Sequence, residues 1–594
     1  MKEISRLFDC VNLNYEKHPD KVLLAGKENG KYREYTPKEV KEIVDKLACG
    51  LLRLGLGPGD GTPEGKDKIA LIARNRPEWI FIDLAIQKIG AVLTPIYPTI
   101  GDPELEYILQ DAAVKTIFIN DDSFLEKLDP ILKNLPLLKT FYSIDASSRI
   151  PQWTKLMEGV SEEDHQKVEA IAASIKHEDL ATIIYTSGTT GKPKGVMLTH
   201  HNIYSNVRDS MDCFPPGEDL RSLSFLPLNH SFERMVMYLY LFKGVSVYFA
   251  ESIETIVDNL KEVKPQIFTT VPRLLEKVYE KIMQKGMELT GIKKSLFFWA
   301  HGLAKRFEIN QNLGWWYNFQ LNLANKLIFN KWREALGGEV LCIVSGGAAC
   351  PVKLIRIFTA ARIIIMEGYG LTETSPVISV NRYDEKDRMF GTVGPLIHNV
   401  EVKIASDGEI LCKGPNVMAG YYKMPEETAE VMEGEWFKTG DIGTIVNNRF
   451  LKITDRKKEI FKTSGGKYVA PVAVENRMKE SIYIENIMIV GAGMKFTSAL
   501  IVPSMENLKK WASNHGLSPL THEQLLKNDK VQALFLSEVN RLNDGLNHVE
   551  QVKKFALVPT EWSVDSGEMT PKLSLRRKII LDKYQKLIEG IYED

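Results

Sequence analysis

A run of glycine, hydroxyl and lysine residues, YTSGTTGKPKGVMLTH at positions 185–200, has the composition of a phosphate-binding loop. Glycines let the backbone approach a polyanion, and successive backbone N–H groups then form an anion-binding concavity. The run differs from the Walker A motif GxxxxGK[ST], because Thr186 replaces its first glycine and Pro193 replaces its Ser or Thr. Composition alone leaves a phosphate loop and an ordinary surface loop equally open.

Three further polar clusters follow apolar runs, and each has a structural interpretation beside a chemical one. His230 and Glu233 lie in LPLNHSFER, where a lone histidine is usually structural. Glu373 in GYGLTETSP is either an acidic residue at a helix N-terminus or a ligand of phosphate-bound Mg²⁺. Asp441 in WFKTGDIG either forms an Asx turn or accepts hydrogen bonds from two sugar hydroxyls.

Short apolar runs alternate with helical patterns, and this order predicts the elements that position the clusters. The predicted strands are 68–73, 91–97, 116–120, 181–185, 246–250, 266–271, 339–347 and 362–370. Buried strands alternating with helices predict parallel-rich sheets, whose ligands bind outside the carboxyl ends of the strands. The glycine-rich turns after ATIIY, EVLCIV and RIIIM are therefore expected at one site.

The length of 594 residues and a change of pattern near residue 391 predict more than one domain. We predict an α/β fold with a large N-terminal domain, 1–455, of parallel-rich sheets flanked by helices plus a β-barrel-like subdomain. A small α+β C-terminal domain, 456–594, is expected to follow a hinge near Asp455–Lys458.

Composition narrows the class of protein. The 76 Lys and Arg residues balance 77 Asp and Glu residues, which argues against nucleic-acid binding. None of the six cysteines forms a CxxC pair, so reduced thiols in a cytoplasm are expected. The N-terminus lacks the apolar core of a signal peptide, and no apolar run approaches the ~18 residues of a membrane span. We therefore expect a cytoplasmic protein.

Residues 281–333 stand apart, because they contain nine Lys or Arg residues and only Glu288 and Glu308 as acidic residues, an excess of nine minus two, or +7. Two apolar stripes have helical spacing: Leu296, Trp299, Leu303, Phe307, and Trp316, Phe319, Leu323, Leu327. One interpretation is a basic amphipathic surface near a membrane, at its inner face, or near the entry for a lipid. The other, which we favour here, is two helices packed on the core with solvated basic faces.

The motifs YTSGTTGKPKG, LPLNHSFER, SGGAA, GYGLTETSP, TGDIG and ITDRKKEIFKTSGGKYVAP occur in this order, and the set resembles the acyl-adenylate-forming superfamily. The resemblance extends to about residue 580 and is greatest to the AMP-forming long-chain fatty-acid–CoA ligases. It implies a two-step reaction with Mg²⁺. A fatty carboxylate attacks the α-phosphate of ATP, giving acyl-AMP and pyrophosphate, and the thiolate of coenzyme A then displaces AMP.

The resemblance also implies a role for each matching residue. The β- and γ-phosphates would be held by Thr186, Ser187, Gly188, Thr189, Thr190, Gly191 and Lys194. The adenine pocket would be lined by Gly346, Gly347, Ala348, Tyr369 and Gly370. Thr372 would reach the α-phosphate, His230 would lie by the acyl carboxylate, and the Mg²⁺ ligands would be Thr186 and Glu373. The ribose ligands would be Asp441 and Arg456. Lys458 would be the hinge. The turn that approaches coenzyme A would be Gly465, Gly466 and Lys467, and Lys462 would match a lysine that some members use in this second state.

One position departs from the family. Long-chain members typically read TPTLKLKR near the C-terminus, whereas this chain reads TPKLSLRR, so Ser574 occupies the usual place of the catalytic lysine. Lys572 lies two residues earlier, on the same face of an extended segment, and we favour it as the substitute over Arg576. Otherwise adenylation lacks its lysine.

Two alternatives to a ligase stay open: an enzyme that loads the acyl group onto a carrier protein, and a catalytically weakened acyl-adenylate-binding protein. The imperfect Walker A match disfavours a plain P-loop ATPase. The sequence does not reveal the oligomeric state.

Overall fold

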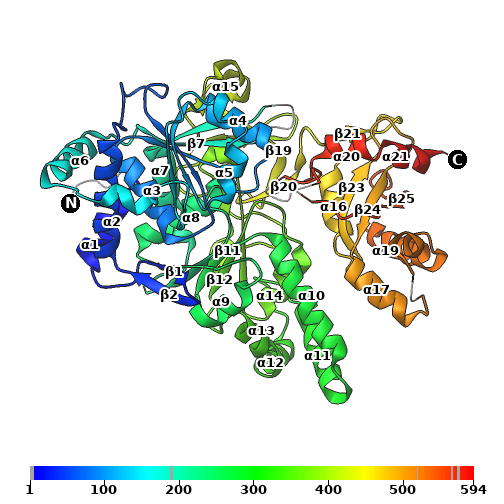
Figure 1. Cartoon of the computed structure of the whole chain (residues 1–594). Coiled ribbons are helices and arrows are strands. Elements are labelled where there is room, and N and C mark those ends of the chain that lie inside the picture. The colour runs from blue at the N-terminus through cyan, green and yellow to red at the C-terminus, as the bar shows by residue number, and fades with distance from the viewer. Residues whose placement is uncertain are drawn as a thin grey trace. The chain divides into compact units, whose positions relative to one another are not determined.

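The computed structural model describes residues 6–186, 192–217, 219–517, 520–563, 566–570 and 575–593 (Figure 1). The chain divides into two compact units. Unit 1 comprises Met1–Val402 with Cys412–Lys438, and unit 2 comprises Lys403–Leu411 with Thr439–Asp594. Each unit is described here by itself.

Unit 1 contains a seven-stranded sheet that carries the candidate phosphate loop. In sheet order its strands are β17 (Gly420–Tyr421), β8 (Lys194–Thr199), β7 (Leu180–Thr186), β4 (Val92–Pro95), β3 (Lys68–Ile72), β5 (Val114–Ile119) and β6 (Thr140–Ser143). The five strands from β7 to β6 are parallel, and β8 is antiparallel to β7.

An eight-stranded sheet forms the second layer of unit 1. In order its strands are β14 (Val377–Val380), β13 (Ile364–Gly370), β12 (Cys342–Ser345), β11 (Ile267–Thr270), β9 (Arg221–Ser224), β10 (Ser246–Phe249), β1 (Leu24–Glu28) and β2 (Lys31–Tyr35). Neighbours from β13 to β1 are parallel. The eight predicted strands and the parallel-rich α/β fold are thus confirmed.

The helices of unit 1 connect these strands. They are α1 (Asp9–Lys17), α2 (Pro37–Arg53), α3 (Pro77–Lys88), α4 (Asp102–Asp111), α5 (Ser123–Leu128), α6 (Glu162–Ser174), α7 (His200–Ser210), α8 (Ser231–Lys243), α9 (Ile256–Val263), α10 (Pro272–Glu288), α11 (Gly291–Lys305), α12 (Trp315–Ala324), α13 (Asn330–Ala335), α14 (Val352–Ala360) and α15 (Pro425–Val431). Among the helices that the structure describes, none combines the length and apolarity that crossing a membrane requires.

Helix α3 shows why an apolar sequence can contain a charge. It contacts β4 of one sheet and β1 of the other, and it is buried around nearly all of its circumference. Its Asp83 is matched by Arg234 of α8, whose guanidinium donates to the carboxylate at 2.6 Å and to the Thr182 hydroxyl at 2.6 Å. The pair satisfies the buried charge and links α3, α8 and β7.

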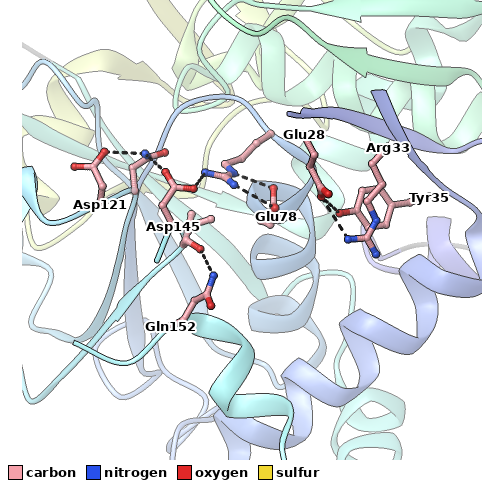
Figure 2. A network of polar contacts seen from close by, with 10 residues as sticks. Glu28, Arg33, Tyr35, Glu78, Asp121, Asp145 and Gln152 are labelled. Atoms are coloured by element: carbon pink, nitrogen blue, oxygen red, sulfur yellow. Dashed lines mark hydrogen bonds and ion pairs between the residues drawn. The ribbon is translucent and has the colours of Figure 1, made fainter. Parts of the chain in front are cut away.

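A polar network lies at the carboxyl ends of β5 and β6 (Figure 2). Asp145 accepts hydrogen bonds from Arg76 at 2.8 Å and from Asn120 at 2.9 Å. Arg76 also donates to Glu78 in the first turn of α3 at 2.9 Å. These contacts fix the strand ends relative to the start of α3.

The change of sequence pattern after residue 391 marks the start of a five-stranded, half-barrel sheet. This sheet is the β-barrel-like subdomain that we predicted. Its strands are β15 (Glu401–Ile404), β16 (Glu409–Lys413), β18 (Met432–Glu433), β19 (Trp436–Val446) and β20 (Phe450–Arg456).

Unit 2 is of the α+β type. Its further strands are β21 (Phe461–Lys462), β22 (Tyr468–Val469), β23 (Ile484–Val490), β24 (Ser498–Pro503) and β25 (Lys554–Leu557). The sheet β23-β24-β25 carries a core of its own. Its helices are α16 (Pro471–Met478), α17 (Met505–Asn514), α18 (His522–Leu526), α19 (Asp529–Asn543), α20 (Arg577–Lys583) and α21 (Gln585–Tyr592).

The two apolar stripes of residues 281–333 have different environments. In α11, Leu303 is buried and Trp299 packs against the core, as we predicted. In α12, Trp316 and Phe319 are each 55% exposed. The prediction that both stripes pack on the core is therefore wrong for α12, because helical spacing reports an apolar face and not what covers it.

All six cysteines are free and buried: Cys10, Cys49, Cys213, Cys342, Cys350 and Cys412. Burial raises the pKa of every one of these thiols, since the thiolate is disfavoured away from water.

Candidate functional site

The candidate phosphate loop connects β7 to β8. Thr186 ends β7 and pairs with Lys194 at the start of β8. Gly195 follows, where an added Cβ would lie 2.8 Å from Cγ2 of Ile183, so close strand packing requires glycine there. The predicted ligands between these strands, Ser187, Gly188, Thr189, Thr190 and Gly191, lie outside the described residues.

Tyr421 of β17 connects the end of this loop to Glu373. Its hydroxyl donates to Oε1 of Glu373 at 3.0 Å, and the ammonium of Lys194 lies 4.9 Å from its ring centroid. Met418 adds a backbone hydrogen bond to the carbonyl of Glu373 at 2.8 Å. Strand β17 pairs with β8, which fixes Tyr421 beside Lys194. The structure thus brings together two predicted site residues through a tyrosine that we did not predict.

Thr372, the residue before Glu373, contacts the start of α8. The hydroxyls of Thr372 and Ser231 lie 3.1 Å apart, and both residues are buried. His230 is the N-cap of α8, and its Nδ1 accepts a hydrogen bond from the backbone of Phe232 at 3.1 Å. His230 therefore has a structural function as a cap, while its position next to Ser231 keeps it close to Thr372.

The predicted adenine-pocket residues lie at the carboxyl ends of two neighbouring strands: Gly346, Gly347 and Ala348 just after β12, and Tyr369 and Gly370 as the last residues of β13. Gly347 has φ +79°, a conformation that favours glycine, and Ala348 beside it is exposed. A Cβ on Gly346 would lie 3.1 Å from the ring of Phe232. Gly370 follows Tyr369 and approaches the Pro376 carbonyl so closely that an added Cβ would lie 1.7 Å away. Glycine is thus sterically required at position 370.

Two buried carboxyl groups lie among the strands of this sheet. Glu367 of β13 accepts a hydrogen bond from the backbone N–H of Cys350 at 2.8 Å, which ties β13 to the SGGAAC turn. Glu233 of α8 accepts hydrogen bonds from the hydroxyls of Ser224 and Thr269. Burial raises the pKa of each carboxyl group to about 7. Both groups are therefore partly protonated near neutral pH.

In unit 2, Asp441 and Arg456 are cross-strand partners in the β19–β20 hairpin. The Arg456 Nε lies 3.3 Å from Oδ1 of Asp441, and Asp441 is buried while Arg456 is exposed. The arrangement places a carboxylate, which accepts hydrogen bonds, beside a guanidinium, which donates them.

The other predicted residues of unit 2 lie on an exposed segment. Lys458 and Lys462 are both exposed, and the ammonium of Lys462 lies 4.6 Å from the ring centroid of Tyr468. Gly465 and Gly466 form the turn between β21 and β22, with Gly466 at φ +72°.

Lys572 and Ser574 lie outside the described residues. Shortly after them, the guanidinium of Arg577 binds Glu459 at 3.0 Å and Glu475 at 2.6 Å. This double ion pair anchors the start of α20 to the segment that follows β20 and to α16.

The oxygen donors that we predicted for a metal are the Glu373 carboxylate and the Thr186 hydroxyl. Oxygen donors suit Mg²⁺, which takes one or two carboxylates and completes its coordination with phosphate oxygens and water. The described part of the chain has no cluster of three or more His, Cys, Asp and Glu side chains that would hold a metal alone. The donor set therefore fits a metal that arrives with a phosphate.

Comparison with known proteins decides the family. A family model described as AMP-binding enzyme matches residues 12–422, and one for the AMP-binding enzyme C-terminal domain matches residues 458–594. The chain belongs to the AMP-binding enzyme family. This AMP-binding enzyme is 32% identical over 585 residues to the long-chain-fatty-acid–CoA ligase FadD15 of Mycobacterium bovis, covering 97% of this chain and 95% of that one. It is also 32% identical to the human long-chain-fatty-acid–CoA ligase 1, covering 94% and 82%.

Solved structures show the same fold. The anthranilate CoA ligase AuaEII in complex with anthranoyl-AMP matches with a TM-score of 0.73 at 18% identity, covering 97% of both chains. The adenylation domain of a carboxylate reductase from Mycobacterium chelonae matches with a TM-score of 0.75 at 18% identity, covering 99% of this chain and 91% of that one. These matches confirm the predicted adenylate-forming architecture.

Sequence reasoning missed Tyr421, Ser231 and Glu367. Each acts through a contact with a residue far away in the chain, and no local pattern marks such a contact. The apolar residues before Glu367 indicate only a buried strand, and the glycine before Tyr421 indicates only a turn or an irregular strand.

Proposed function

We propose that this protein activates long-chain fatty acids to acyl-CoA through an acyl-AMP intermediate, consuming ATP and coenzyme A and releasing pyrophosphate and AMP. The observation that carries the proposal is the near full-length similarity to proteins named long-chain-fatty-acid–CoA ligases. The contacts of Lys194, Tyr421 and Glu373 agree with it, because they place a cation and a carboxylate at the end of the glycine-rich loop.

In the first half-reaction, an anionic carboxylate must approach an anionic phosphate, which requires charge neutralisation and positioning. Lys194 and the residues from Thr186 to Gly191 would hold the β- and γ-phosphates, and Thr372 would reach the α-phosphate. His230 would lie by the acyl carboxylate. Mg²⁺ on Glu373 and Thr186 would neutralise phosphate charge. The adenine would lie against Gly346, Gly347, Ala348, Tyr369 and Gly370.

In the second half-reaction, the thiolate of coenzyme A attacks the acyl carbon and AMP leaves with the bonding electrons. Asp441 and Arg456 would keep the ribose of AMP bound. We assign Lys458 to a hinge between domains 1–455 and 456–594, and Gly465, Gly466 and Lys467 to the turn that approaches coenzyme A. Lys462 would act in this second state. The exposure of this turn supports the assignment. Residues that act only in the second half-reaction must move freely, and few contacts in this state hold them in place.

Lys572 would supply the positive charge that stabilises the adenylation transition state in place of the usual lysine at position 574. An enzyme that loads a carrier protein would differ from this proposal only in the acceptor of the acyl group. If Lys572 does not stabilise the adenylation transition state, the protein would be a catalytically weakened acyl-adenylate-binding protein.

We also propose a cytoplasmic protein that contacts the inner face of a membrane through residues 281–333, since long-chain fatty acids partition into bilayers.

The test is fatty-acid-dependent release of pyrophosphate from Mg-ATP, with and without coenzyme A, for the wild type, Lys572→Ala and Ser574→Lys. We expect turnover of long-chain acids by the wild type and a loss of about 100-fold or more in Lys572→Ala, the cost of a missing transition-state charge contact. Thioester formation on coenzyme A identifies the acceptor. A silent wild type that Ser574→Lys activates would instead identify a weakened adenylating enzyme.

A further inference from the structure

Exposed apolar side chains are concentrated in one short stretch of unit 1. Of the twenty large apolar side chains that are exposed in the described chain, nine lie between residues 287 and 327. Single exposed apolar residues are normal on a soluble protein, but a concentration of them marks an interaction surface. The nine are Met287, Ile292, Leu296, Phe298, Trp315, Trp316, Phe319, Leu323 and Leu327.

Five of these side chains lie on α12 and its continuation, and we call them the α12 face: Trp315, Trp316, Phe319, Leu323 and Leu327. Trp315 is 78% exposed, and the rings of Trp316 and Phe319 stack with centroids 5.7 Å apart. Their spacing places them on one side of the helix. The opposite side packs on the core through Ala324 and Phe329. Figure 1 shows α10, α11 and α12 extending along the lower side of unit 1.

Exposed lysines lie on the helical segment that carries the α12 face and on the helix α11 that contacts it. Lys326 and Lys331 are exposed on the same helical segment, and Lys293 and Lys294 are exposed on α11. Residues 281–333 contain only two acidic residues against nine basic ones. A second copy of the chain fits this surface poorly, because a two-fold interface would place like charges opposite each other. A negatively charged, apolar partner fits both the aromatic residues and the lysines.

We propose that the α12 face docks in the plane of a bilayer that contains anionic lipids. Tryptophan prefers the membrane–water interface, where its ring is apolar and its N–H stays hydrated. The lysines beside the face reach anionic headgroups while their methylene stems cover apolar surface. This geometry is that of an in-plane amphipathic helix and requires no membrane-spanning segment. The inference rests on the proposed function, because docking on a bilayer would bring the enzyme to the fatty acids dissolved in it.

The experiment measures co-sedimentation of the full-length protein with vesicles of phosphatidylcholine alone or with phosphatidylglycerol, in the absence of ATP and fatty acid. We expect binding to the anionic vesicles that weakens at high salt. Trp315→Ser/Trp316→Ser should lower the partition coefficient about tenfold or more through lost apolar burial. Lys326→Gln/Lys331→Gln should lower it roughly 25-fold, at about fivefold per lysine near an anionic surface.

Matched controls lie elsewhere in unit 1. Ile253→Ser removes an apolar side chain that is 75% exposed, and Lys133→Gln/Lys139→Gln removes two exposed charges. Neither should change the partition. The proposal is overturned if the wild type binds neither kind of vesicle, or if the α12 variants bind as well as the wild type. It is also overturned if the α12 variants change the molecular mass of the protein in solution, because the face would then be a subunit interface.

Ligase activity on a water-soluble shorter-chain acid, measured without vesicles, separates the two proposals. We expect the α12 variants to retain it, since none of the changed residues belongs to the candidate site. A wild type that binds vesicles but forms no acyl-CoA would refute the proposed function and leave the membrane surface standing.

Discussion

The candidate site residues of unit 1 and those of unit 2 are held in different ways. In unit 1, Lys194 and Glu373 are joined through Tyr421, and Thr372 is buried against Ser231. In unit 2, Lys458, Lys462, Gly465 and Gly466 are all exposed, on and before a short turn. Asp441 is the exception, because it is buried in a hairpin.

This difference indicates a division of labour. Residues fixed by side-chain contacts are already positioned for a charged transition state and reorganise little when it forms. Residues on an exposed turn are tied to fewer neighbours and are free to serve in one step of a reaction and not in another. We therefore expect changes in unit 1 to affect adenylation, and changes in the turn of unit 2 to affect thioester formation.

The largest effect should come from Glu373→Gln, which removes the carboxylate proposed for Mg²⁺. We expect pyrophosphate release to fall about 100-fold or more, while the unfolding temperature stays close to that of the wild type.

A smaller effect on the same step should come from Tyr421→Phe, which keeps the ring under Lys194 but removes the hydroxyl. It should raise the Mg²⁺ concentration for half-maximal rate about tenfold, as loss of a partner of a metal ligand does. Equal Mg²⁺ dependence of Tyr421→Phe and the wild type would contradict this link.

The next effect concerns stability and pH. Burial raises the pKa of Glu367 from 4.5 to about 7, so its contribution to stability is fully present below pH 4.5 and is lost as pH rises through about 7. Glu367→Gln keeps the acceptor for the Cys350 N–H and has no charge to bury. Relative to the wild type, this variant should gain about 3 kcal/mol between pH 4.5 and pH 8, as urea unfolding measures.

The exposed carboxyl group of Glu334 provides the control for this experiment. Glu334→Gln makes the same chemical change at an exposed position and controls for the substitution itself. A Glu367→Gln variant whose stability runs parallel to the wild type at all pH values would show that Glu367 is not buried as a titrating group.

The smallest effect should come from Gly466→Ala in the turn of unit 2. A Cβ at φ +72° meets open space, so only backbone strain of about 1 kcal/mol is added. We expect thioester formation to slow about fivefold with adenylation unchanged, measured as separate half-reactions. Gly516→Ala has nearly the same φ, +71°, and equally open surroundings, and should alter neither step. A loss of adenylation in Gly466→Ala would undo the proposed division between the units.

The sequence predicted the strands, because short buried strands leave local apolar patterns, and it placed glycine-rich turns at their carboxyl ends. It could not predict how α11 and α12 differ. Leu303 and Phe319 belong to equally regular stripes, yet one is buried and the other is exposed. Burial depends on neighbours such as α14 that come later in the chain. Tyr421 escaped prediction for the same reason, since its partner Glu373 lies 48 positions away.

The burial of all six cysteines has a practical consequence for a protein proposed to consume a thiol substrate. A chromogenic thiol reagent added to the native protein should meet no reactive protein sulfur, so its colour reports the disappearance of coenzyme A alone. For the same reason the protein should not form mixed disulfides with oxidised coenzyme A during prolonged turnover. A reaction centred on sulfur would thus proceed on a scaffold whose own sulfur atoms take no part in exchange.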